Sequence, residues 1–150
     1  MNRLRILLGD DHALILEGIR ELLASKYDVV ASAKDGKQLV AEALRAKPDV
    51  VVLDVSMPIL NGIEAAKQIR KALPGTRFVF LSMHYDAIYV RKALEAGGSA
   101  YVLKSGAADE LRTALELVRK GGTYLSPGLG EPLIETADTP LARSRGQASS

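Results

Sequence analysis

The chain has 150 residues, 47% of them hydrophobic and 25% charged, with a net charge of +2 at pH 7. This length suits one domain with a sizeable core, and so small a charge gives no argument for nucleic acid or an anionic membrane as a partner. The absence of cysteine excludes disulfides and thiolate metal sites, and two histidines are too few for a histidine-rich site. The apolar stretch 4–8 is too short for a signal peptide or a membrane span, so we expect a cytoplasmic protein without a membrane partner.

The first third of the chain predicts two strands and two helices. Residues 4–8 are an apolar run typical of a buried strand, and the acidic pair Asp10-Asp11 follows it. Apolar residues at helical spacing then predict a helix through 16–23. A second strand is predicted at 29–31, followed by a helix through 39–44 that must end before Pro48.

The middle of the chain repeats this pattern around a more informative stretch. Residues 50–53 are a buried strand that ends in Asp54, and the turn residues Pro58 and Asn61-Gly62 lead into a helix that continues to about residue 73. Residues 78–81 predict a fourth strand, which ends in Ser82. In open α/β sheets ligands bind outside the carboxyl ends of the strands, so Asp54 is placed where a ligand would bind.

The last predicted elements are a helix at 86–96, a fifth strand at 100–103 that ends in Lys104, and a helix through 111–118. Strands that alternate with helices form a parallel sheet with right-handed crossovers and helices on both faces. The sequence therefore predicts an α/β fold with a doubly wound, five-stranded parallel sheet.

The C-terminal residues differ in composition. The chain becomes rich in Gly, Pro, Ser and Thr beyond residue 126, which is typical of a flexible segment. We expect residues 1–126 to form the folded domain and residues 127–150 to be a linker or tail. A linker indicates a second, output module after it, and we expect this module to be missing from the chain.

Five chemically active side chains follow the predicted strands: Asp10, Asp11, Asp54, Ser82 and Lys104. A parallel sheet brings these strand ends to one edge, and three neighbouring carboxylates repel one another unless a cation binds between them. Oxygen ligands suit Mg²⁺ or Mn²⁺. Beside a metal and an ammonium group, Asp54 can act as a nucleophile toward phosphorus.

Together these motifs resemble the receiver domain of two-component response regulators, the CheY-like domain, and the NarL/FixJ type in particular. The similarity covers residues 3–126. It implies a flavodoxin-like fold with strand order 2-1-3-4-5. The matching residues are Asp10-Asp11, Asp54 with Met57-Pro58 and Asn61-Gly62, residues 81–84, and residues 98–104.

The resemblance implies a signalling switch rather than an enzyme with a separate substrate. Asp54 would accept a phosphoryl group from a histidine kinase. Mg²⁺, or Mn²⁺, would be bound by Asp11 directly, by Asp10 mostly through water, by Asp54, and by the backbone carbonyl of Ser56. Lys104 would pair with a phosphoryl oxygen.

The resemblance also assigns residues to switching and to phosphate lifetime. Ser82 would bind another phosphoryl oxygen and release Tyr101 to turn inward, and Met83 and His84 would tune the lifetime. Met83 is larger than the residue at this position in many relatives, so we expect slow loss of phosphate. Ser105 follows Lys104 where many receivers have proline, which leaves the geometry of that peptide bond open.

Partners follow from the same resemblance. They are a cognate histidine kinase, a second copy docked through the fourth helix, fifth strand and fifth helix, and DNA only through a C-terminal helix-turn-helix domain that is missing here. We expect the readout surface to lie around Tyr89, Ala93, Tyr101 and Leu111. The output would be control of transcription.

Other interpretations remain for single residues and for the whole chain. Asp11 could be only the N-cap of the first helix, Ser82 only a loop hydroxyl, Tyr101 only strand packing and His84 only an exposed loop histidine; His12 is expected to face solvent. An aspartyl-nucleophile hydrolase would need a second acid at the position of Ser56, and a nucleotide-binding protein would need a glycine-rich loop. An inert binding module with this fold remains the main alternative.

Overall fold

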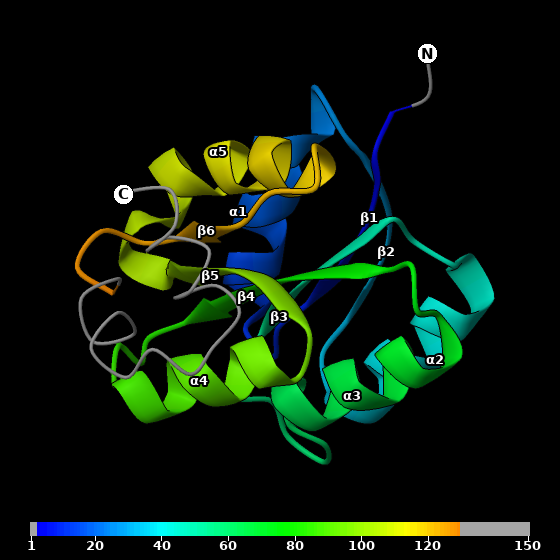
Figure 1. Cartoon of the computed structure of the whole chain (residues 1–150). Coiled ribbons are helices and arrows are strands. Elements are labelled where there is room, and N and C mark those ends of the chain that lie inside the picture. The colour runs from blue at the N-terminus through cyan, green and yellow to red at the C-terminus, as the bar shows by residue number, and fades with distance from the viewer. Residues whose placement is uncertain (1–2, 130–150) are drawn as a thin grey trace.

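The computed structural model describes residues 3–129. A central sheet of six parallel strands has the order β2-β1-β3-β4-β5-β6. The first five strands have the predicted order, so the α/β receiver topology is confirmed (Figure 1). The strands are β1 (Arg5–Gly9), β2 (Asp28–Ala33), β3 (Val50–Asp54), β4 (Arg77–Ser82), β5 (Gly98–Leu103) and β6 (Tyr124–Leu125).

Five α-helices connect the strands and cover both faces of the sheet. Helices α1 and α5 lie on one face, and α2, α3 and α4 lie on the other (Figure 1). Within residues 3–129, no helix has the length and apolar character needed to span a bilayer. The helices are α1 (Ala13–Ala24), α2 (Gly36–Ala46), α3 (Gly62–Ala72), α4 (Ala87–Glu95) and α5 (Ala107–Arg119), with a short 3₁₀ turn, η1 (Lys104–Gly106), before α5.

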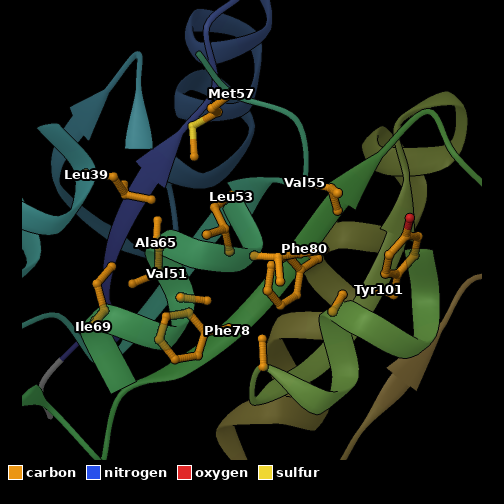
Figure 2. Packing of buried hydrophobic residues seen from close by; sticks show 14 of the residues in the cluster. Leu39, Val51, Leu53, Val55, Met57, Ala65, Ile69, Phe78, Phe80 and Tyr101 are labelled. Atoms are coloured by element: carbon orange, nitrogen blue, oxygen red, sulfur yellow. The ribbon is translucent and has the colours of Figure 1, made fainter. Parts of the chain in front are cut away.

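The core consists of two apolar layers, one on each face of the sheet. Successive residues of a strand point to opposite faces, so Val51 and Leu53 of β3 pack in one layer while Val50 and Val52 pack in the other. Figure 2 shows the layer beneath α2, α3 and α4, where Phe78 lies close to Val51 and Ile69. Burial on both faces explains why β3 is a continuous apolar run instead of an alternating one.

The sixth strand was not predicted from the sequence. Tyr124 and Leu125 pair in parallel with Ala100 and Tyr101 of β5, and Leu129 is buried in the same core layer as Tyr101. Two residues are too short to give a detectable strand pattern. The packed body therefore reaches Leu129, and the rest of the predicted tail, residues 130–150, lies outside the described residues.

The start of α3 is fitted closely against the end of β3. A Cβ atom on Gly62 would lie 1.9 Å from the backbone oxygen of Asp54, so only glycine allows this approach. The Gly62 N–H donates to the Val55 carbonyl at 2.9 Å, and the Asn61 side chain accepts from the Glu64 N–H as the helix N-cap. These contacts fix the backbone on both sides of Asp54.

Candidate functional site

The carboxyl ends of β1 and β3 bring together the acidic residues that the sequence predicted. One ligand atom each of Asp10, Asp11, His12 and Asp54 lies within 4.8 Å of the other three. Asp10 directly follows β1, and Asp54 is the last residue of β3. The predicted convergence of the three acids at one edge of the sheet is therefore present, with a histidine added to it.

Lys104 lies between the two buried acids. Its Nζ is 2.7 Å from Oδ2 of Asp54 and 2.9 Å from Oδ2 of Asp10, and the other oxygen of Asp54 accepts the Ser56 N–H at 3.0 Å. Nζ donates a hydrogen bond to Asp54 and forms an ion pair with Asp10, whose buried Oδ2 has no other polar partner. Buried charges of this kind need partners, because desolvation penalises each of them.

The pKa of Lys104 shows which effect dominates. Burial alone would lower the pKa of the ammonium group, but hydrogen bonds and charge interactions with Asp10 and Asp54 outweigh burial and raise it. Lys104 is therefore charged at neutral pH. One ammonium group faces three carboxylates, which leaves negative charge in excess, and the buried oxygen of Asp10 has no polar partner besides Lys104. These donors fit a divalent cation.

The outer part of the site is exposed. His12, with a side chain that is 58% exposed, occupies the N-cap position of α1 without a capping hydrogen bond from its side chain. Asp11 is thus not the N-cap, which was the alternative for this residue. His12 was expected only to face solvent, yet its Nδ1 lies 3.0 Å from Asp10 Oδ1 and 3.2 Å from Asp11 Oδ1. The signal that could have revealed this contact is its position directly after two acids.

A cavity of about 200 Å³ opens onto the acidic cluster. Met83 lies at its rim with 74% of its surface exposed. The ring of His84 stacks on Tyr89 with centroids 4.4 Å apart, and its Nε2 is 3.4 Å from Ser56 Oγ. Met83 and His84 therefore border the space into which Asp54 opens. The cavity is lined by Asp11, His12, Asp54, Ser56, Met83, His84 and Lys104.

Ser82 and Tyr101 contact the same short loop after β4. Ser82, at the end of β4, is fully buried, and its Oγ accepts the His84 N–H at 2.8 Å. The Tyr101 hydroxyl donates to the His84 carbonyl at 2.8 Å. The Tyr101 ring is fully buried and already lies inward (Figure 2), so it has no inward turn of the expected kind left to make. Burial is the main cause that raises its pKa to about 12.

Comparisons with known proteins agree with this geometry. The response regulator receiver domain family matches residues 6–116. The transcriptional regulatory protein DegU of Brevibacillus brevis is 37% identical over 136 residues, which cover 89% of this chain and 58% of DegU. The chain belongs to the response regulator receiver domain family. It is a signalling switch rather than a classical enzyme, and it spans about three-fifths of the length of the curated transcription regulators that it matches.

Solved receiver domains have the same fold. A LuxR-family response regulator from Aurantimonas sp. SI85-9A1 superposes with a TM-score of 0.85 at 36% identity, covering 91% of this chain and 99% of that one. The isolated receiver domain of RcsB from Salmonella enterica, solved in the presence of the phosphomimetic BeF3-, gives 0.79 at 27% identity, covering 87% and 98%. Another structure contains RcsB dimers bound to DNA, with a TM-score of 0.79 at 28% identity, covering 89% and 69%.

One feature of the receiver domain differs from the sequence-based expectation, and a second answers a question that the sequence left open. Ala93, Tyr101 and Leu111 are fully buried, so they cannot be contact residues of the expected readout surface; of the four residues named for it, Tyr89 is exposed. The peptide bond between Lys104 and Ser105 is trans, since residues 3–129 contain no cis peptide bond.

The end of β5 is held by a residue that sequence reasoning missed. Ser126 Oγ accepts the Leu103 N–H at 2.9 Å and donates to Glu110 Oε1 at 2.6 Å, and the Ser126 N–H donates to the Tyr101 carbonyl. Leu103 directly precedes Lys104, so Ser126 helps to position the ammonium group. No local signal links residues so far apart in sequence, because only the strand register brings them together.

A larger hollow of about 530 Å³ lies at the opposite ends of the strands, around Asp49, Arg77 and Arg119. Its polar groups already have structural partners: Asp49 Oδ2 accepts the Arg5 N–H at 2.9 Å, and the Arg77 guanidinium donates to the Val118 carbonyl. Ligands of parallel α/β sheets bind at the carboxyl ends of the strands, so the smaller cavity beside Asp54 is the functional candidate.

Proposed function

We propose that this receiver domain works in the cytoplasm and accepts a phosphoryl group on Asp54 from the phosphohistidine of a histidine kinase, with Mg²⁺ or Mn²⁺ as cofactor, and thereby controls a transcriptional output. One observation carries this proposal: Lys104 Nζ lies between Oδ2 of Asp54 and Oδ2 of Asp10, at the edge of a cavity. An inert binding module would gain nothing from two buried acids and a buried lysine placed together.

The chemistry needs positioning and charge neutralisation more than covalent assistance. A carboxylate oxygen of Asp54 attacks phosphorus, a P–O bond forms, and the P–N bond to the kinase imidazole breaks. The bonding electron pair stays on the imidazole nitrogen, which becomes protonated as it leaves. Lys104 Nζ already touches Asp54 Oδ2, so its charge lies where negative charge gathers on the phosphoryl oxygens.

The cation would be held by Asp10, Asp11, Asp54 and the backbone carbonyl of Ser56. When bound, it would supply further positive charge to the phosphoryl group. Receiver domains generally bind Mg²⁺, and the acidic cluster of this chain has oxygen donors of the kind that Mg²⁺ prefers.

We propose that switching passes through the loop at residues 83–86. Ser82 Oγ and the Tyr101 hydroxyl both bond to the backbone of His84, so a Ser82 hydroxyl that turns to a phosphoryl oxygen releases the His84 N–H and lets the loop move with Tyr101. Shifting a two-state equilibrium from 1:99 to 99:1 requires about 5.5 kcal/mol. New phosphoryl contacts to Lys104 and Ser82 supply about 3–6 kcal/mol.

The phosphoryl contacts reach the required free energy of about 5.5 kcal/mol only at the upper end of their range of about 3–6 kcal/mol. We therefore propose that dimerisation through α4, β5 and α5 completes the change to the active conformation. DNA contact would come from a separate output domain. A solved structure of a relative with the same fold contains RcsB dimers bound to DNA, which supports a dimer as the form that acts on DNA.

Acetyl phosphate with Mg²⁺, followed by intact-mass measurement, tests the proposal. The native chain should gain about 80 Da, and EDTA should prevent the gain. Asp54→Asn should gain nothing, whereas Asp28→Asn, at an exposed position on β2, should behave like the native chain. A native chain without the adduct would refute the proposed function.

Hydrogen exchange with and without beryllofluoride tests the switch separately. We expect changed exchange rates in residues 83–86, α4 and β5. Identical exchange in α4 and β5 would contradict the proposed route, even if Asp54 is phosphorylated.

A further inference from the structure

The acidic cluster contains a nitrogen donor that the oxygen ligands of the proposed magnesium site do not require. His12 Nδ1 lies 3.0 Å from Asp10 Oδ1 and 3.2 Å from Asp11 Oδ1. His12 also belongs, with Asp54, to the group whose ligand atoms all lie within 4.8 Å of one another. The imidazole is therefore positioned among the carboxylates instead of beside them.

These distances match those between neighbouring ligands of one metal ion. Two donors that each lie about 2.1 Å from a six-coordinate ion, at a right angle, are about 3.0 Å apart. His12 Nδ1 has this spacing from an oxygen of Asp10 and from an oxygen of Asp11. A hydrogen bond from Nδ1–H would give similar distances, so spacing alone does not decide between the two.

Two further observations favour a ligand. Asp10 is 1% exposed, and its Oδ2 has no polar partner besides the ammonium group of Lys104, although the cluster holds three carboxylates. The polar contacts of the His12 ring are with Asp10 and Asp11, and the ring does not cap α1. By contrast, the ring of His84 is stacked on Tyr89.

The chemistry of the donors predicts which ions would use His12. Mg²⁺ prefers carboxylate, carbonyl and water oxygens, whereas imidazole suits Ni²⁺, Zn²⁺ and other late transition metals, and affinity for a given site rises from Mn²⁺ through Co²⁺ to Ni²⁺. The ring is 58% exposed, so water can accept the Nε2–H while Nδ1 offers its lone pair.

We propose that His12 is a specificity-determining metal ligand of this site: its Nδ1 coordinates transition-metal ions, while Mg²⁺ binds through the oxygen ligands alone. This inference rests on the proposed function, since it concerns the same cation site. It follows that the receiver domain binds Ni²⁺ and Cu²⁺ through a mixed nitrogen and oxygen set, and that His12 sets how strongly it discriminates between these ions and Mg²⁺.

Calorimetric titration of the untagged 150-residue chain with Ni²⁺ and with Mg²⁺ tests the proposal. His12→Asn keeps a short polar side chain suited to an N-cap but removes the imidazole. We expect its Ni²⁺ affinity to fall at least about tenfold, since loss even of an outer-shell partner of a metal ligand costs that much, while its Mg²⁺ affinity is unchanged. The control variant Leu14→Ala, at an exposed position of α1 that does not line the cavity, should change neither affinity.

Electron spin-echo spectroscopy of the Cu²⁺ complex gives a readout independent of affinity, because imidazole suits Cu²⁺. Nitrogen modulation from a coordinated imidazole should appear in the native chain and in Leu14→Ala, and should be absent in His12→Asn. A His12→Asn variant with the native ratio of Ni²⁺ to Mg²⁺ affinity, or a native Cu²⁺ complex without nitrogen modulation, would overturn the inference.

The two proposals fail in different ways. If Mg²⁺ supports the phosphoryl adduct on Asp54 but the Cu²⁺ complex shows no nitrogen coupling, the assignment of His12 is wrong and the proposed function stands. If the native chain binds neither Mg²⁺ nor Ni²⁺, both are wrong.

Discussion

The inner and outer halves of the site differ in how far their residues depend on one another. Asp10, Asp54 and Lys104 are buried, and each carboxylate has the ammonium group as its charge partner. His12 and Met83 are exposed at the rim of the same cavity. In the inner half, charge pairing and chemistry cannot be separated, because each buried charge needs its partner. In the outer half, a side chain can alter ion selectivity or phosphate lifetime at little cost in stability.

Removing Lys104 is the most direct test of this difference between the inner and outer halves of the site. In metal-free buffer, Lys104→Met should lower the free energy of unfolding by about 3–5 kcal/mol, because two buried carboxylates then lack a charge partner. Urea denaturation at neutral pH measures the loss. Saturating Mg²⁺ should restore more stability to this variant than to the native chain, since the ion replaces the missing positive charge.

Lys67→Met is the matched control for that experiment. Lys67 forms an exposed ion pair with Glu64 at 3.0 Å, so its loss should cost no more than about 1 kcal/mol. Equal losses for Lys67→Met and Lys104→Met would show that the inner half does not depend on its ion pairs.

Raising the pH above 10 should have the next largest effect, a loss of unfolding free energy that depends on the buried Tyr101. Burial raises the pKa of Tyr101 from 10.0 to about 12, so the folded state keeps a proton that the unfolded state loses. The stability contributed by neutral Tyr101 is complete below pH 10 and is lost as pH rises to 12, with a slope of about 1.4 kcal/mol per pH unit. The raised pKa of Lys104 acts in the same direction. Urea denaturation of Tyr101→Phe should show a shallower decline over this range, and an equal decline would contradict the assignment.

Removing the Ser82 hydroxyl should have a smaller effect. Ser82→Ala leaves the His84 N–H without its acceptor, which should cost about 1–3 kcal/mol of unfolding free energy and slow phosphorylation by acetyl phosphate. Ser32→Ala removes an acceptor of the exposed Arg20 guanidinium and should cost less. Equal costs would mean that the contact of Ser82 with the loop is unimportant.

Met83 should affect lifetime with the least effect on stability. Met83→Ala should change the free energy of unfolding by no more than about 0.5 kcal/mol, because the side chain is exposed. Its aspartyl phosphate should decay faster than that of the native chain, since water reaches the cavity more easily. Leu14→Ala, which is exposed but does not line this cavity, should keep the native half-life, and an unchanged or longer half-life for Met83→Ala would refute the expectation of slow phosphate loss.

Much of the inner half could be predicted from the sequence. Apolar runs that end in Asp54, Ser82 and Lys104 identify strand ends, and parallel topology then brings those ends to one edge. The buried ion pairs follow from that convergence. The outer half could not be predicted in the same way, because the direction of an exposed side chain such as His12 depends on its own torsion angles and neighbours.

The sequence by itself determined the order of strands and helices and the acids, hydroxyl and lysine at the strand ends, since hydrophobic periodicity and turn residues are local signals. Tertiary structure alone decided that Tyr101 lies inward, that Ser126 holds the end of β5, and that Tyr124 and Leu125 add a sixth strand. These contacts join residues 17 and 23 positions apart in the chain, so they depend on the register of strands and not on any local pattern.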